Sequence, residues 1–231
     1  MTPINATDVV GRAFAIYKEH AAPLLAAAFA VFFITAVASF VLDHGFLLIL
    51  VAYVISLVAH TFYKGMVVRL VDDVRDGTLD ASVGDLFRSV APVAVPLLLA
   101  SILLGILITI GLFIVIVPGL FLMTIWAVVA PAIVLEGRGV FDGMSRSWEL
   151  VKGNSWQVFG VIVIIFLLEF GLGIVGAAIG AIGGDVTRAI VQLAVVVLVA
   201  PLSALATSVL YFALLDAHGT VPTPAASATT L

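Results

Sequence analysis

The stretch PVAVPLLLASILLGILITIGLFIVIVPGLFLMTIWAVVAPAIVL, residues 92–135, contains no charged residue. As a single helix it would be roughly 65 Å long, about twice the thickness of the hydrocarbon core of a bilayer. Pro118-Gly119, in its second half, is a dipeptide typical of a turn. The stretch therefore predicts two membrane-spanning helices, residues 92–115 and 119–135, which turn back on each other at this dipeptide.

The composition of the whole chain agrees with a membrane protein. Of its 231 residues, 63% are hydrophobic and only 10% are charged, whereas soluble domains carry about 25% charged residues. The net charge of −4 gives no reason to expect a nucleic-acid partner. The chain has no cysteine, which excludes disulfides and thiolate metal sites. We therefore expect an all-α integral membrane protein.

Four more apolar stretches are long enough to span a bilayer, so we expect six spans in one domain, residues 1–218. Asp43-His44-Gly45 separates the first two spans, and Gly77 is a predicted helix stop after the second. Pro201 removes a backbone hydrogen bond inside the last span and predicts a kink. Residues 219–231 predict a disordered cytoplasmic tail. The predicted spans are residues 21–42, 46–68, 92–115, 119–135, 155–182 and 186–215.

The basic residues predict the orientation of these spans. Nine of the ten Lys and Arg residues fall on one side of the predicted membrane, and Arg188 alone falls on the other. Loops rich in Lys and Arg stay on the cytoplasmic side of a membrane. We therefore expect both termini in the cytoplasm, and the inner (plasma) membrane of a prokaryote as the location.

Three short segments on the basic side, residues 5–19, 82–90 and 140–152, have the pattern of amphipathic helices. Such helices lie in the membrane interface, with basic side chains toward the headgroups. Each precedes a pair of spans, and Val10-Gly11-x-x-Phe14 in the first matches Val83-Gly84-x-x-Phe87 in the second. The pattern is that of a three-unit parallel repeat, although any six-span chain with its N-terminus inside alternates in a similar way.

One run around the fourth span carries a family resemblance. Residues 118–119 (PG), 130–137 (APAIVLEG) and 145–153 (SRSWELVKG), with Trp156, resemble the membrane domain of glycerophosphoryl diester phosphodiesterases. In the two-part enzymes of that family the chemistry takes place in a separate soluble barrel, for which this chain has no room. The resemblance implies a stand-alone membrane module without phosphodiesterase activity.

Glu169 is the sharpest candidate for a functional residue, because it lies roughly 20 Å along the fifth predicted span. A carboxylate there costs several kcal/mol unless it is paired, hydrated or protonated, so such residues often mark binding sites or pathways. The alternative is a structural Glu that is hydrogen-bonded to a hydroxyl or to Gln192, with Arg188 as a possible ion-pair partner. His60, in the second span, is either a group that titrates near neutral pH or a satisfied polar residue.

The fifth span is also rich in glycine. Residues 171–176 spell G-x-G-x-x-G, but a dinucleotide site needs a strand before this motif, and here it lies inside an apolar span. Small residues four apart instead allow two membrane helices to approach closely. We therefore expect helix packing at Gly173, Gly176, Gly180 and Gly184.

A charged group is predicted at the basic interface. Glu136, Arg138 and Arg146 are expected to form a structural ion-pair network that ties the third amphipathic segment to the fourth span. The alternative is that Arg146 and Lys152 bind lipid headgroups. Trp148 fits an aromatic belt at the membrane surface.

No set of Ser, His and Asp suggests a catalytic site, and the four histidines fall in separate segments, so we expect no enzyme activity, no metal and no cofactor. The leading hypothesis is a non-enzymatic membrane module: a scaffold or bilayer-organising protein whose partners are lipids, further copies of the chain or other membrane proteins. The alternative is a small transporter or carrier that uses Glu169 and needs a polar cavity near the midplane. An intramembrane enzyme acting on lipid is a third hypothesis.

Overall fold

The computed structural model describes residues 4–42, 45–75 and 82–220, and within these ranges the chain is helical, with no strand. Six helical stretches in these ranges are long and apolar enough to cross a bilayer: α2, α3, the run from α4 to α5, the α6–α7 pair, α9 and α10. The predicted all-helical fold is thus confirmed, as is the number of helical stretches that could span a membrane. The helices are α1 (Ala6–Glu19), α2 (Ala21–Val41), α3 (Phe46–Arg75), α4 (Val83–Val90), the 3₁₀ helix η1 (Ala91–Val93), α5 (Ala94–Ile114), α6 (Ile116–Ile125), α7 (Val129–Glu136), α8 (Val140–Val151), α9 (Ser155–Gly180) and α10 (Gly184–His218).

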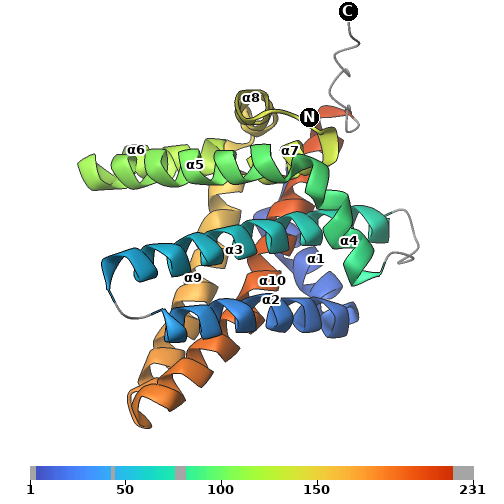
Figure 1. The fold of residues 1–231 in the computed structure, drawn as a ribbon. Coiled ribbons are helices and arrows are strands. Elements are labelled where there is room, and N and C mark those ends of the chain that lie inside the picture. Colours follow the sequence, from blue (N-terminus) through green and yellow to red (C-terminus); the bar gives the residue numbers. More distant parts are fainter. Residues whose placement is uncertain (1–3, 43–44, 76–81, 221–231) are drawn as a thin grey trace, which may run out of the picture.

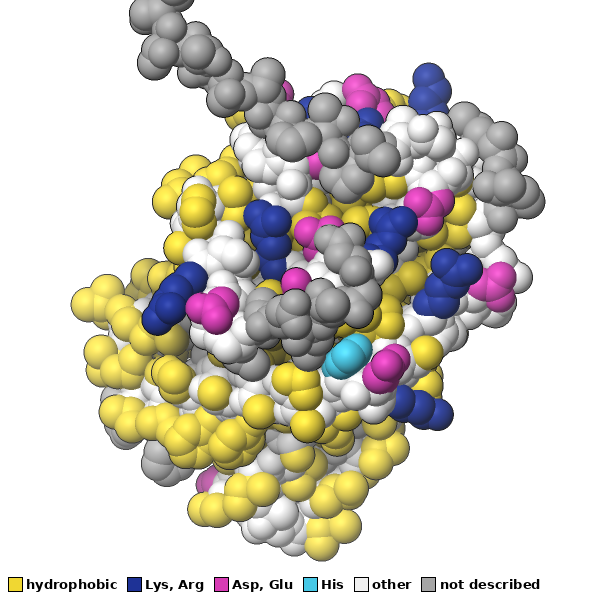
Figure 2. Space-filling view, turned by 90° about the vertical axis from the view of Figure 1, so that its right-hand side faces the viewer, with side chains coloured by type: hydrophobic (Ala, Val, Ile, Leu, Met, Phe, Trp, Pro, Cys, Tyr) yellow, Lys and Arg dark blue, Asp and Glu magenta, His cyan; other side chains and the backbone are white. Residues whose placement is uncertain are grey.

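The long helices pair into three antiparallel hairpins, α2–α3, α5–α6 and α9–α10, and these are the most extensively packed pairs in the fold (Figure 1). The hairpins come together where α3 ends and α4 begins, close to α1, and we call this the basic end. At the other end, the far end, the α5–α6 and α9–α10 junctions lie well apart (Figure 1). Figure 2 looks onto the basic end and shows Lys, Arg, Asp and Glu side chains gathered there, with apolar side chains below them.

Burial places the core at the basic end. All the buried residues of α10 lie between Pro201 and Ala217, in its second half. In α3 nearly all lie between Thr61 and Val71. The far halves of the same helices carry exposed apolar side chains such as Phe46 and Val186. Because lipid tails are as apolar as these side chains, they can stay exposed within a bilayer.

The predicted turn at Pro118-Gly119 is wrong. The chain reverses three residues earlier, at Val115, whose backbone is extended (φ −154°, ψ 132°). Pro118 then falls in the first turn of α6, where a backbone N–H has no partner within the helix and proline is tolerated. Gly119 serves close packing instead, because a Cβ atom there would lie 2.6 Å from the backbone nitrogen of Leu112 in α5.

The fourth span also differs from the single helix expected, because residues 126–128 separate α6 from α7. Ser147 of α8 is fully buried beside this break. Its hydroxyl donates to the Ile125 carbonyl oxygen (2.8 Å) and accepts from the Val128 N–H (3.3 Å). The side chain of one helix thereby satisfies backbone groups that the break leaves without partners.

The bounds of the third and sixth spans differ less from the prediction. The third span begins as a continuation of α4, whose N-cap Ser82 accepts from the Asp85 N–H at 3.2 Å. The sixth is longer than predicted, and α10 continues through Pro201 to His218. Gly77, Asp43-His44 and most of the predicted tail (221–231) lie outside the described residues.

The close packing of α5 and α6 can be tested with Gly119→Ala. The added methyl group meets both the backbone and the side chain of Leu112, so we expect a loss of about 1–3 kcal/mol in stability. The measurement is thermal unfolding in detergent.

Gly105→Ala is the matched control, because Gly105 lies on the same hairpin with no neighbouring heavy atom within 4 Å of an added Cβ. It should unfold at or slightly above the wild-type temperature. Equal unfolding temperatures for both variants would contradict the proposed contact.

Candidate functional site

Polar side chains in the membrane-spanning part lie on stripes with helical spacing. In α3, Ser56, His60 and Lys64 follow one another at intervals of four residues, which places them on one face of the helix. In α10, Arg188, Gln192 and Ser203 also share a face. These two faces are turned toward the same space, because residues of both helices line common cavities.

Glu169 and His60, the two intramembrane candidates from the sequence, line the same cavity. It has a volume of about 280 Å³ and lies between α3, α9 and α10. Ser203 is the hydrogen-bonding neighbour of the Glu169 carboxylate, and Lys64 interacts with that carboxylate electrostatically. The cavity thus brings an acid, a base and a histidine from two hairpins together. Its lining residues are His60, Tyr63, Lys64, Glu169, Val195, Val196, Val199, Ala200 and Ser203.

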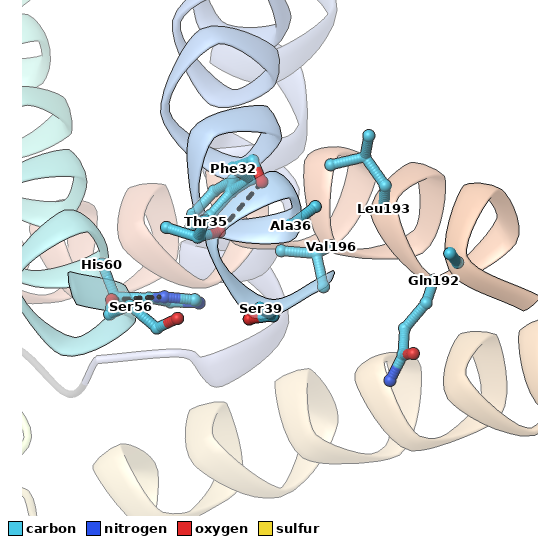
Figure 3. Close-up of a pocket in the computed structure, with 10 residues that line it drawn as sticks. Phe32, Thr35, Ala36, Ser39, Ser56, His60, Gln192, Leu193 and Val196 are labelled. Carbon is cyan, nitrogen blue, oxygen red and sulfur yellow. Dashed lines mark hydrogen bonds between the residues drawn. The ribbon is translucent and has the colours of Figure 1, made fainter. Parts of the chain in front are cut away.

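A second cavity, of about 560 Å³, adjoins the first and shares His60 and Val196 with it. Figure 3 shows it between α2, α3 and α10, with the hydroxyl-bearing side chains of α2 and α3 on one side. His60 Nδ1 lies 3.1 Å from the Ser56 carbonyl oxygen. The centroid of the His60 ring lies 4.5 Å from the centroid of the Phe32 ring. Gln192 reaches from α10 toward α9 (Figure 3).

A third cavity, of about 450 Å³, lies between α9 and α10 and contains Arg188. It shares Gln192 and Val196 with the second cavity, so the three cavities adjoin one another along α10. We call these three adjoining cavities together the polar cleft. It follows one face of α10 from Arg188 near the far end to Ser203, a rise of roughly 22 Å at helical geometry.

The glycines of the α9–α10 hairpin have different roles. A Cβ atom on Gly176 would lie 2.6 Å from Val195 Cγ2, and one on Gly180 would lie 3.2 Å from Arg188 Cα, so α9 approaches α10 closely at both. Gly173 has no such neighbour and lines the third cavity instead. Gly184 has a φ of +75° at the start of α10, where it serves the turn between the two helices.

The charged group at the basic end is separate from the cleft. Glu136 is 1% exposed at the end of α7. Arg138 Nε and Arg146 Nε (3.0 Å) both donate to its carboxylate, and so does the Tyr211 hydroxyl (2.7 Å). The network joins α7, α8 and α10. Glu136 lines none of the three cavities of the polar cleft, which favours a structural role.

The other interfacial candidates lie outside this network. Trp148 is exposed on α8. Its ring meets the Phe121 ring edge to face, with 6.0 Å between the two ring centroids. Lys152 follows the end of α8 and is exposed. Neither forms a hydrogen bond or an ion pair with Glu136 in the described part of the chain.

Three residues of the polar cleft, Lys64, Ser56 and Ser39, were not among the site residues predicted from the sequence. The signal that could have revealed Lys64 is the four-residue spacing from Ser56 through His60, which marks a polar face on an apolar helix.

The comparison with protein families identifies the group to which the protein is related. Residues 43–203, more than half of the chain, match a family described as Uncharacterised protein family (UPF0259). The chain belongs to this family. The UPF0259 match contains α3 to α9 and most of α10, and hence all the charged residues that line the polar cleft. Neither the curated proteins nor the solved structures give a match. The resemblance to the phosphodiesterase membrane domain stays a prediction.

The Glu136 network can be tested with Glu136→Gln. This change removes the negative charge between two partly buried arginines, and removal of one partner from a buried ion pair is costly. We expect a loss of about 3 kcal/mol in the free energy of unfolding, measured by denaturation in mixed micelles.

Glu149→Gln is the control, because Glu149 is mostly exposed and lies 3.7 Å from the same Arg146. It should change stability by no more than about 0.5 kcal/mol. A similarly small effect of Glu136→Gln would show that the network contributes little.

Proposed function

We propose that this protein is a multi-pass membrane carrier that binds a small polar solute in the polar cleft. The observation that carries the proposal is the position of Glu169. This carboxylate is not enclosed by apolar side chains but lies beside a cavity that also holds Lys64 and His60. Carriers commonly bind their solutes between helices near the bilayer midplane, at ionisable side chains.

The energetics of the site support this function over a purely structural one. Ionised groups inside a bilayer cost several kcal/mol each, and this cost falls when they are paired or hydrated. Lys64 and Glu169 interact across α3 and α9, yet the space between these helices and α10 is left open instead of being filled by side chains. Side chains that only hold the helices together need no such space.

The packing of the hairpins supports movement around the cleft. The buried core is confined to the basic end, and the far halves of α3 and α10 remain largely exposed. The α9–α10 hairpin contacts itself closely at Gly176 and Gly180, so it can move as one unit against α2 and α3. We propose that this movement alternately opens the two ends of the cleft.

A second candidate function is that of a lipid-contacting or bilayer-organising scaffold, which the exposed aromatic side chains near α8 favour. Phe141, Trp148 and Trp156 are all exposed there. We propose that α8 lies in the interface as an amphipathic helix and contacts lipid headgroups. On α1, Val9 and Ala13 are buried against the bundle, whereas Phe14 is exposed.

The proposal includes several expectations from the sequence. The basic end faces the cytoplasm of a prokaryote, across the inner membrane, and the protein has no enzymatic activity. A three-unit repeat is supported by the chain order, in which α1, α4 and α8 each precede one of the three hairpins. Association with further copies of the chain or with other membrane proteins is compatible with the apolar far halves.

The chain has no cysteine, so single cysteines can report directly on water in the cleft. We expect Gln192→Cys and Ser203→Cys in proteoliposomes to react with a membrane-impermeant thiosulfonate reagent. The reactive species is the thiolate, which forms in water and not in hydrocarbon. Ile190→Cys is the matched control, because Ile190 lies at the same depth of α10 but is 63% exposed outside the cleft. It should react at least about tenfold more slowly.

Adding the reagent to one side of the membrane at a time tests transport more strictly. A carrier requires Gln192→Cys to react from the far side and Ser203→Cys from the basic side. Equal, slow labelling of all three positions would mean a dry cleft and favour the scaffold. Access from one side alone would contradict the carrier.

A further inference from the structure

We propose that the polar cleft selects small anions, such as carboxylates, phosphates or sulfonates, through Arg188 at its far mouth. This proposal rests on the proposed function, because it requires water in the cleft. It goes beyond that function by naming the chemical class of the solute and the residue that recognises it.

The charge balance of the lining residues is the first observation. Within the described residues the cleft is lined by two basic side chains, Lys64 and Arg188, and one carboxylate, Glu169. Lys64 and Glu169 interact with each other. No carboxylate of the described residues forms an ion pair with Arg188. The excess charge of the cleft is therefore positive and is located at Arg188.

The position of Arg188 is the second observation. It is the one Lys or Arg residue on the far side of the predicted membrane topology, and it lines the cavity between α9 and α10. Gly180 lets α9 approach Arg188 closely, because a Cβ atom there would lie 3.2 Å from Arg188 Cα. Asp185 precedes Arg188 by one helical turn but lines none of the three cavities.

The chemistry of the guanidinium group decides the ligand class. Arginine stays protonated and offers five N–H donors in a planar fork that matches the oxygen atoms of carboxylates and phosphates. Next to it, the Gln192 side chain makes no hydrogen bond within the described residues and has two further N–H donors to offer. Further along, Ser39 and Ser56 place two hydroxyl groups in the second cavity (Figure 3).

The experiment compares two thiosulfonate reagents of similar size at Gln192→Cys, one with a sulfonate group and one with a trimethylammonium group. The protein is reconstituted into phosphatidylcholine vesicles, which carry no net charge. Each rate is divided by the rate with a small free thiol, which removes the intrinsic reactivity of the reagent. We expect the normalised ratio of the anionic to the cationic rate to be about tenfold, because a charged, water-filled cleft concentrates ions of opposite sign.

Arg188→Gln in the same background should reduce this ratio to about one, whereas Arg188→Lys should retain most of it. Arg88→Gln is the control, because Arg88 is an equally charged residue that is 85% exposed on α4 at the basic end. It should leave the ratio unchanged. Higher ionic strength should lower the ratio of the parent protein, because salt screens the attraction. This dependence is measurable even if Arg188→Gln does not fold.

The outcomes separate the two proposals. A ratio near or below one, at a position that both reagents reach, would overturn anion selection and leave the water-filled cleft intact. A tenfold ratio that survives Arg188→Gln would overturn the assignment to Arg188. If neither reagent reaches Gln192→Cys, the water-filled cleft itself is contradicted and both proposals fail.

Discussion

The fold depends on a buried carboxylate at the basic end. Glu136 ends α7, receives Arg138 from the following turn and Arg146 from α8, and accepts a hydrogen bond from Tyr211 near the end of α10. The consecutive helices α7 and α8 and the second half of α10 are thereby fixed to one point. Between membrane helices there is little hydrophobic driving force, so specific polar contacts and close packing have to determine where helices meet. The core of this protein accordingly surrounds the network, and the hairpins diverge with distance from it.

This arrangement also explains why a polar cleft can exist inside so apolar a chain. Where the hairpins are held tightly, in the second halves of α3 and α10, side chains fill the space. Farther from the network the helices separate, and the polar stripes of α3 and α10 face each other across a gap. Lys64 and Glu169 lie close to this boundary between the packed and open parts.

The sequence predicted the number and type of the spans because hydropathy is a sum over some twenty residues and tolerates local error. It also pointed to Glu169 and His60, since a polar group in an apolar span stands out by itself. Details that depend on a few atoms were harder to predict. Pro118-Gly119 has the composition of a turn, but a proline in the first turn of a helix is equally acceptable, and only the packing of Gly119 against Leu112 decides between them. The role of Lys64 depends on which helix faces α3, and one sequence does not contain that information.

The break between α6 and α7 has a consequence for biogenesis. The carbonyl group of Ile125 and the N–H group of Val128 lie within the fourth span, and their partner is the hydroxyl group of Ser147, about twenty residues later in the chain. When the fourth span first leaves the ribosome and enters the insertion machinery, this partner has not yet followed it. The span therefore enters the bilayer either hydrated at this point or as an uninterrupted helix, and it reaches its final form only after α8 has packed beside it. The final shape of this span is thus set by a segment that follows it in the chain.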